Sequence, residues 1–512
     1  MALTKVTGGL LGNLPTGTSN VAVGDTALDS ITSDARHNVA IGGSAGTAVT
    51  TGDFNSFIGS LAGFTETGGS YSTGVGYGTL YSQNVNGDAH NTAVGYTAGV
   101  AITTGIQNTL IGALAGDAIT TGNYNVSLGY ASLGGDTKGF GSVAVGHSAL
   151  LSQNFTSATN AYNTAVGHVA GTSVTTGTNN TLIGALAGDA LQAASDNVAV
   201  GFEALSTETG GQNNVAIGPR ALKAQVNSSG NIYNTAVGSS AGAAITTGIQ
   251  NTLIGGLAGD AMTDADYNTA VGVAALGNDT LGSRNTALGS FALANQTFTS
   301  ATNSYNTAVG FDTGVYISTG VQNTLIGALA GDAITTGVQN TIVGYNNDLD
   351  TGGADNRFGF GVNLALTAGS TIKIGNGSTF ITNTWGSNAT WTHSSDERLK
   401  ENIQDATLGL SFINDLRTVN YNWRLQKDVP EEIRSEYEFE RDTEVRQHGL
   451  IAQEVKAALD KAGVDTFLGW SEEKDGTQMI SESMFVFPLI KAIQELSEQN
   501  AALTARIETL EG

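Results

Sequence analysis

The chain of 512 residues contains no cysteine, only four prolines and only six histidines. Without cysteine there is neither a disulfide framework nor a thiolate metal site, so rigidity has to come from backbone pairing and burial. None of the histidines is paired at the spacing of metal ligands. We therefore expect neither a metal nor another cofactor.

Basic residues are scarce as well, because 21 lysines and arginines stand against 45 acidic residues, for a formal net charge of −24. This charge argues against a nucleic-acid partner, since binding to phosphates needs a basic face. The chain has no run of 18 apolar residues, so membrane insertion is not expected either. Residues 1–15 lack a basic segment followed by an apolar stretch, so we expect no secretion signal and assembly inside a cell.

Composition changes abruptly at Ser395. Residues 1–394 contain eight of the 21 basic and 21 of the 45 acidic residues, whereas only six of the 70 glycines follow Ser395. A charge-poor, glycine-rich part therefore meets a charged, glycine-poor part, and we expect two different folds.

The first part is a repeat. A motif, Asn-(Thr/Val)-x-(Val/Ile/Leu)-Gly, recurs nineteen times, mostly every 17 residues, and every fourth step is longer, which creates a higher-order unit of 71 or 72 residues. The glycines of the motif are Gly24, Gly42, Gly59, Gly76, Gly95, Gly112, Gly129, Gly146, Gly167, Gly184, Gly201, Gly218, Gly238, Gly255, Gly272, Gly289, Gly310, Gly327 and Gly344. We call each repeat a rung.

Two positions of the rung indicate how rungs stack. The residue before each glycine is always Val, Ile or Leu, as expected for a strand that faces a continuous core. Four residues before each glycine stands Asn in 17 of 19 rungs, with Ser72 and Ser142 as exceptions, and stacked amides can hydrogen-bond from rung to rung. A rung cannot bury its apolar face alone, so neighbouring rungs and chains must cover it.

The motif resembles the head of trimeric autotransporter adhesins, in which a related rung winds a parallel β-roll and three rolls pack together. The fold class expected from this resemblance is mainly β, a trimeric parallel β-roll or solenoid rod of 17-residue rungs over residues 19–345. Residues 1–18 contain no good rung and are expected to form the attachment end.

Residues 346–394 are expected to form a separate small β segment. Residues 371–375 and 378–382 alternate polar and apolar side chains around a Gly-Asn-Gly turn, which predicts a hairpin. Trp385 and Trp391 follow and are either a glycan-stacking surface or buried core of a trimer.

Three blocks mark the second part: Ser395-Asp396-x-Arg398-x-Lys400-x-x-Ile403, then residues 448–455 (HGLIAQEV), then residues 489–496 (LIKAIQEL). In this order they resemble the C-terminal intramolecular chaperone of phage tail fibres and endosialidase tailspikes. The resemblance implies that residues 395–512 trimerise the fibre and then release themselves. It makes Ser395 the nucleophile, Lys400 its base and Ser394-Ser395 the scissile bond.

The residues alone leave this chemistry open. A serine hydroxyl needs an adjacent base, and a lysine can act as one only if desolvation or nearby positive charge, such as that of Arg398, lowers its pKa. In a helix, Ser395 and Lys400 are five residues apart and do not share a face, so a dyad needs a non-helical turn or a subunit contact. Alternatively, Ser395 and Asp396 cap a helix and Lys400 points to water.

The end of the chain has a heptad pattern from Val486. Steps of three and four residues predict a coiled coil whose seam includes one polar residue, Asn500, which would fix register and oligomer state. The seam residues are Leu489, Ile493, Leu496, Asn500, Leu503, Ile507 and Leu510. A single amphipathic helix on the surface of the domain is the alternative.

These patterns favour a phage tail fibre: a homotrimer in the virion that attaches to a tail or baseplate component and binds a glycan or protein on the host surface. The alternatives are a tailspike enzyme that degrades a host polysaccharide and a bacterial trimeric adhesin. An enzyme would need paired carboxylates, whereas Asp117, Asp189, Asp260 and Asp332 recur at one offset, as turn residues do. The only chemistry expected is self-cleavage.

The insertions of the long rungs are the other candidate receptor surface besides the two tryptophans, and they are equally consistent with spacers. They contain Phe155, Tyr162, Tyr233, Phe298 and Tyr305.

Overall fold

The computed structural model describes residues 19–367, 371–384, 392–393, 395–431 and 444–512. Contacts divide the chain into two compact units, Met1–Ser394 and Ser395–Gly512. The attachment end proposed for residues 1–18 lies outside the described residues.

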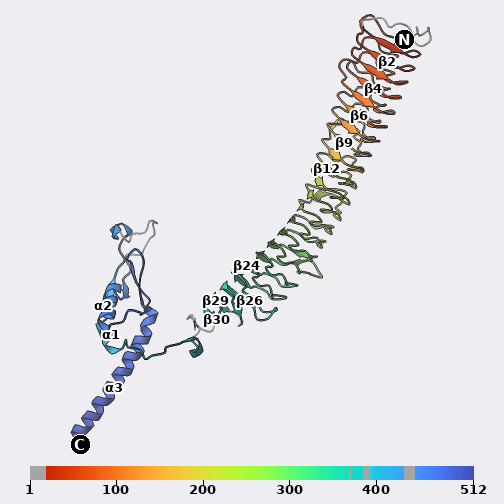
Figure 1. The fold of residues 1–512 in the computed structure, drawn as a ribbon. Helices are drawn as coiled ribbons and strands as arrows, with labels where there is room; N and C mark the ends of the chain where they lie inside the picture. Colours follow the sequence, from red (N-terminus) through yellow and green to blue (C-terminus); the bar gives the residue numbers. More distant parts are fainter. Residues whose placement is uncertain (1–18, 368–370, 385–391, 394, 432–443) are drawn as a thin grey trace, which may run out of the picture. The chain divides into compact units, whose positions relative to one another are not determined.

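The first unit is a parallel β-solenoid (Figure 1). Each rung contributes a short strand directly before its glycine, and successive strands pair in parallel without a register shift, as in Thr92↔Thr109 and Val94↔Ile111. In-register parallel stacking, as predicted, is confirmed. The strands of this sheet are β1 Val21–Val23, β2 Val39–Ile41, β3 Ser56–Ile58, β4 Thr73–Val75, β5 Thr92–Val94, β6 Thr109–Ile111, β7 Val126–Leu128, β9 Val143–Val145, β11 Thr164–Val166, β12 Thr181–Ile183, β13 Val198–Val200, β15 Val215–Ile217, β17 Thr235–Val237, β18 Thr252–Ile254, β19 Thr269–Val271, β21 Thr286–Leu288, β23 Thr307–Val309, β24 Thr324–Ile326, β25 Thr341–Val343, β27 Phe358–Val362, β29 Thr371–Asn376, β30 Thr379–Thr384 and β31 Thr392–His393.

The stack continues past Gly344, the last glycine of the sequence motif. Strand β27 pairs in parallel with β25, and β29 pairs in parallel with β27. The predicted hairpin is confirmed, because β30 returns antiparallel to β29 with Asn376 opposite Thr379. The solenoid therefore has two more turns than the motif indicates, and the hairpin is built on the last of them.

Three of the four longer rungs carry a second, two-residue strand that pairs in parallel with one of the rung before, as β10 does with β8. The first longer rung has a single parallel bridge, Ser70↔Asp88, and a similar strand pair, β26 and β28, follows the last rung glycine. These additional strands are β8 Gly139–Phe140, β10 Thr159–Asn160, β14 Gly211–Gln212, β16 Gly230–Asn231, β20 Gly282–Ser283, β22 Thr302–Asn303, β26 Asp348–Leu349 and β28 Ala365–Leu366. The insertions are thus pinned to the solenoid by backbone pairing.

The residue of each strand whose side chain faces the interior is not the one that the sequence led us to expect. The middle residue, usually Ala or Leu, is buried, whereas the Val, Ile or Leu before the glycine faces outward. The expectation that this larger residue lines the core was wrong, because a three-residue strand turns only its middle side chain inward. Ten of the outward side chains are 36–43% exposed: Ile41, Ile58, Ile111, Leu128, Ile183, Ile217, Ile254, Val271, Leu288 and Ile326. We call this column the aliphatic stripe.

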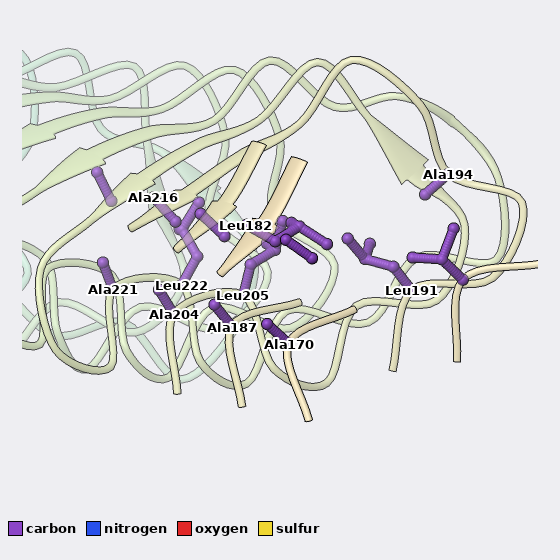
Figure 2. Packing of buried hydrophobic residues seen from close by; sticks show 14 of the residues in the cluster. Ala170, Leu182, Ala187, Leu191, Ala194, Ala204, Leu205, Ala216, Ala221 and Leu222 are labelled. Atoms are coloured by element: carbon purple, nitrogen blue, oxygen red, sulfur yellow. The ribbon is translucent and has the colours of Figure 1, made fainter. Parts of the chain in front are cut away.

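Size complementarity fills the narrow interior. Leu182, in the middle of β12, is fully buried, and glycines stand opposite it in its own rung and the rung before. A Cβ at Gly171 or Gly188 would approach its methyl carbons to 2.6 and 2.7 Å. Figure 2 shows Leu182 among buried Leu and Ala side chains of adjacent rungs, including Leu205 and Leu222.

The asparagine column forms the predicted ladder. Asn268 Nδ2 and backbone N donate to Asn251 Oδ1 at 3.2 and 3.0 Å, and Asn251 contacts Asn234 in the same way. Most of these amides also donate to a backbone carbonyl, as Asn268 Nδ2 does to Gly282 O at 2.9 Å. These buried amides are therefore satisfied within the solenoid, whereas Asn285 Nδ2 of the same column has no partner.

A second polar column is interleaved with the apolar core. This column is the position seven residues after each rung glycine, and its residues repeat every four rungs. Two successive rungs have an apolar side chain there, the third has a buried Asp or Glu, and the fourth has a buried Gln. The Gln donates to the acid one rung away at 2.7–2.8 Å and accepts from the next ladder Asn at 2.8–2.9 Å. The pairs are Glu66 and Gln83, Asp136 and Gln153, Glu208 and Gln225, and Asp279 and Gln296.

The second unit is a small α/β domain. Its elements are η1 Glu397–Leu399, α1 Leu410–Asp415, β32 Val419–Tyr421, η2 Gln426–Asp428, β33 Gln447–Gly449, α2 Ala452–Ala462, β34 Trp470–Glu472, β35 Gln478–Ile480, η4 Glu482–Phe485 and α3 Val486–Glu511. Its core consists of Leu408, Phe412, Val455, Ala458, Leu459 and Phe485.

Helix α3 extends well past this core. Glu495 still contacts the domain, because its carboxylate accepts a 2.8 Å hydrogen bond from Leu410 N at the start of α1. Every residue from 494 to 512 except Glu495 is exposed, including Leu503, Ile507 and Leu510 of the predicted seam at 56%, 53% and 80%. A single chain thus leaves the heptad seam uncovered.

Candidate functional site

The segment that opens the second unit forms a tight turn. Asp396 caps the short helix η1 by accepting from Arg398 N at 2.9 Å, and Lys400 leaves the turn with extended backbone at φ −124° and ψ 146°. Aspartate is a preferred N-cap because its carboxylate satisfies an amide that has no partner inside the helix. The turn reverses direction within six residues.

This reversal brings Lys400 to Ser395. Lys400 Nζ donates to Ser395 Oγ at 2.7 Å within one chain. The sequence left two arrangements open, and the geometry contains part of both: Asp396 caps a short 3₁₀ turn, yet Lys400 bends back onto the serine. A helix would have separated the two side chains, and a single turn followed by extended backbone does not.

The sequence suggested that Arg398 supplies positive charge beside Lys400, but its side chain binds Asp396 instead. Its guanidinium binds the Asp396 carboxylate through two hydrogen bonds, Nε–Oδ1 at 2.9 Å and Nη2–Oδ2 at 2.7 Å. These bonds hold the pKa of Asp396 below its usual value, with the Arg398 side chain as the largest cause. Because its charge is balanced by Asp396, Arg398 acts on the shape of the turn rather than as a free cation beside Lys400.

The dyad lies at the surface of a single chain. Residues 395–407 are exposed throughout, and the apolar side chains of Leu399 and Ile403 are 60% and 65% exposed on either side of Lys400. A lysine in water keeps its proton at neutral pH, and loss of that proton requires desolvation or added positive charge. Ser394, the other residue of the expected scissile bond, lies outside the described residues.

The block at residues 448–455 forms part of the fold of this unit. His448 lies on β33, which pairs antiparallel with β32, and Val455 on α2 is buried in the core. A groove of about 500 Å³ lies beside His448 and is bordered by Val419, Leu450 and Phe485.

The candidate receptor residues separate into two groups. Phe155 and Phe298 are only 5% and 7% exposed, so their rings belong to the interior of the solenoid and are not available on its surface. Tyr162, Tyr233 and Tyr305 are 57%, 50% and 51% exposed. Trp385 and Trp391 lie outside the described residues.

One pair of carboxylates resembles the sequence criterion for a glycosidase. Asp348 is hydrogen-bonded to Asp332, and burial together with this neighbouring carboxyl raises the pKa of Asp348 to about 7, burial being the larger cause. Glycosidases hold their two carboxyl groups about 5 Å or more apart to accommodate the substrate. Two carboxyl groups in direct contact share a proton and leave no space for a substrate between them. We therefore interpret Asp348 and Asp332 as a structural pair and not as a catalytic one.

Within the part of the chain that the structure describes, no group of three or more His, Asp or Glu side chains is placed to hold a metal ion. Among these same residues, no helix combines the length and apolar character needed to cross a bilayer.

Neither a curated protein nor a solved structure matches this chain. A family model does match residues 395–464, and its description is chaperone of endosialidase. The matched segment begins at Ser395, where the two compact units meet, and contains both Lys400 and His448. The C-terminal unit is therefore similar to a chaperone of endosialidase over its first 70 residues, from 395 to 464.

Proposed function

We propose that the chain is a trimeric fibre whose second unit is an intramolecular chaperone that releases itself by cutting the Ser394-Ser395 bond. The observation that carries the proposal is the 2.7 Å contact between Ser395 Oγ and Lys400 Nζ at the start of the segment similar to a chaperone of endosialidase.

The cleavage chemistry follows from the two side chains. Neutral Lys400 takes the hydroxyl proton while Ser395 Oγ attacks the carbonyl carbon of Ser394. The C–N bond breaks, the lysine returns the proton to the leaving amine, and an ester joins Ser394 to Ser395 Oγ. Water hydrolyses the ester, which leaves a carboxylate on residue 394 and a free amine and hydroxyl on Ser395.

Trimer formation would switch this reaction on. Lys400 is in water in one chain, and packing of further chains against Leu399 and Ile403 would desolvate it and lower its pKa. Cleavage would then follow assembly, so a chain that has not assembled would keep its chaperone.

Two uncovered apolar surfaces support the trimer. The aliphatic stripe runs along the solenoid, and the seam of α3 is exposed beyond the domain core. Soluble proteins rarely leave such continuous apolar surface in water, and further copies of the same chain present matching surfaces. In such an arrangement α3 would form the coiled coil and the stripes would face one another.

The fibre role, in a phage virion that binds a host surface, rests on the family similarity together with the solenoid that precedes the matched segment. A tailspike enzyme is less well supported, because the carboxyl groups of Asp348 and Asp332 are in direct contact and the recurring acids stand at one offset of repeated rungs. The release reaction is the part that can be tested most directly.

Expression of the full chain tests the proposal. Mass spectrometry should find fragments 1–394 and 395–512, and Ser395→Ala or Lys400→Ala should leave one intact chain. Lys400→Arg should also stay intact, because arginine keeps its proton. Lys474→Ala, an exposed lysine elsewhere in the same unit, is the matched control and should cleave normally. A wild-type chain that remains uncut in solution would overturn the release reaction.

A further inference from the structure

The insertions of the long rungs end in a recurring pattern. The sequences Asn160-Ala161-Tyr162, Asn231-Ile232-Tyr233 and Asn303-Ser304-Tyr305 share an Asn, a small or apolar residue and a Tyr, at intervals of 71 and 72 residues. In all three the Asn and the Tyr are exposed and the residue between them is buried. The amide and the phenol ring therefore both lie on the outer surface, two residues apart in the chain.

The tyrosines occupy an unfavourable backbone conformation. Their φ angles are 48°, 57° and 50°, in the left-handed region, which costs a bulky residue about 1–2 kcal/mol. Asparagine tolerates this region better, and Asn179 and Asn213 occupy the equivalent position of other rungs with φ 59° and 63°. The tyrosines therefore stand where asparagine would suit the fold better.

Stacking between rings does not explain two of them. The tyrosines stand five residues before a rung glycine, and we call this position of successive rungs the tyrosine column. In the first rungs the tyrosine column is a stack of aromatic rings, with the ring centres of Phe54 and Tyr71 5.1 Å apart. Tyr162 has Gly141 and Asn179 as its column neighbours, and Tyr233 has Asn213 and Gln250. Tyr124 is equally exposed, has φ 62° and also lacks a ring neighbour, so these features do not by themselves distinguish the three tyrosines. What distinguishes them is the exposed Asn two residues before each ring.

The amides are oriented by the preceding rung. Asn213 Nδ2 donates to Asn231 Oδ1 at 2.9 Å, and Arg284 Nε donates to Asn303 Oδ1 at 3.0 Å. These bonds engage the amide oxygens of Asn231 and Asn303, and the Nδ2 group of each exposed side chain is a further hydrogen-bond donor. Strand pairing fixes the backbone of both, because β16 and β22 are held by β14 and β20.

We propose that these three Asn-x-Tyr edges are equivalent subsites for a neutral carbohydrate chain. This proposal rests on the proposed fibre function and names the class of its receptor. An aromatic ring offers an apolar surface for the C–H groups of a sugar, and an amide beside it donates to a hydroxyl oxygen. With successive rungs about 4.8 Å apart, the subsites are about 19 Å apart along the solenoid, which suits a repetitive polymer.

Charge favours a neutral polymer over an acidic one. The column neighbours of the three tyrosines are uncharged apart from Arg284, and the chain as a whole has a net charge of −24. An acidic polysaccharide would be repelled by this field, whereas a neutral one is unaffected by it.

The test uses the full chain on an immobilised panel of neutral polysaccharides, including glucans, galactans, mannans and polymers of N-acetylhexosamines, beside sialylated and uronate polymers. The triple variant Tyr162→Asn, Tyr233→Asn and Tyr305→Asn installs the residue found at the same position of other rungs, so folding should be retained. Binding to at least one neutral polymer should fall about a hundredfold or more in the triple variant, and much less in each single variant, because linked sites act together.

Tyr124→Asn is the matched control. Tyr124 lies in the same column, is as exposed as Tyr162 at 57% and has Gly122 instead of Asn two residues earlier. It should bind like the wild type. The proposal is overturned if the wild type binds no neutral polymer, if it binds only acidic ones, or if the control loses as much as the triple variant.

Light scattering and mass spectrometry on the same samples separate the two proposals. A cleaved trimer that binds no neutral polymer contradicts the carbohydrate subsites alone, whereas an uncut or monomeric wild type contradicts the fibre function.

Discussion

Gln296 Nε2 donates a 2.8 Å hydrogen bond to the carboxylate of Asp279, which lies one rung away inside the solenoid. Gly282 N donates to the same carboxylate at 3.0 Å. Burial nevertheless raises the pKa of Asp279 to about 6, since desolvation outweighs these bonds. Between about pH 4 and about pH 6, the folded chain therefore binds a proton here that the unfolded chain has lost.

This pKa predicts a pH dependence of stability. The pKa is raised from 3.8 in the unfolded state, so its contribution is fully present below about 3.8 and is lost as pH rises through about 6. The loss amounts to about 3 kcal/mol. Urea unfolding at pH 4.5 and 7.5 should show a smaller pH difference for Asp279→Asn than for the wild type. The exposed Asp34→Asn should leave the difference unchanged, and an unchanged difference in Asp279→Asn would contradict the prediction.

A rung glycine should not tolerate a methyl group. Gly201 has φ +137°, and a Cβ there would lie 2.6 Å from the carbonyl carbon of Gly218 in the next rung. Gly201→Ala should lower the thermal unfolding midpoint strongly or prevent folding, since two backbones would have to separate. Gly256→Ala meets nothing within 4 Å and should leave the midpoint unchanged or slightly raised. Equal midpoints for the two variants would show that the close approach is unimportant.

The seam of α3 should matter for assembly and not for the fold of one chain. Ile507 is 53% exposed, so Ile507→Asp removes no contact inside the unit but places a charge in the expected coiled-coil seam. Light scattering should report a loss of trimer, and self-cleavage should fall with it. Ala505→Asp, exposed on the same helix but off the seam, is the control. A trimeric Ile507→Asp variant would exclude the coiled coil.

The carboxylate of Asp396 should set the rate of self-cleavage. Asp396→Ala removes the cap of η1 and both bonds to the Arg398 guanidinium, so Lys400 should reach Ser395 less often. Cleavage followed over time should slow, while the trimer forms normally. Asp405→Ala, an exposed acid outside the turn, should cleave at the wild-type rate. An unchanged cleavage rate in Asp396→Ala would show that the hydrogen bonds of Asp396 are not needed to bring Lys400 to Ser395.

The second unit should be needed for folding and dispensable afterwards. A slip of one 17-residue rung replaces like with like along the solenoid, and the unequal spacing of every fourth rung barely penalises a slip by a whole unit of 71 or 72 residues. Residues 1–394 expressed alone should therefore aggregate or assemble out of register, whereas the same residues released after folding should stay intact. A heat-resistant trimer from residues 1–394 at normal yield would contradict the chaperone role.

The repeated Asn and Gly positions are enough by themselves to determine the solenoid. A motif that recurs with its polar residue and its glycine at fixed offsets can satisfy both only by in-register stacking, and the ladder from Asn234 to Asn268 has this form. The hairpin after Gly375 follows from equally local turn chemistry. The sequence motif also singles out Ser395 and Lys400, although it does not decide whether their side chains meet.

Tertiary structure decided which side chains face inward. In Val198–Val200 the buried middle residue is Ala199, whose small side chain does not indicate a core position in the sequence. The larger apolar side chain of Val200 does indicate one, although it faces outward. The interior accepts the small residue because side chains of the opposite wall, such as Leu205, already fill it. The prediction that Phe155 and Phe298 lie at the surface was wrong for a related reason: burial inside a narrow solenoid depends on the wall that faces a residue, and that wall comes from distant positions of the chain.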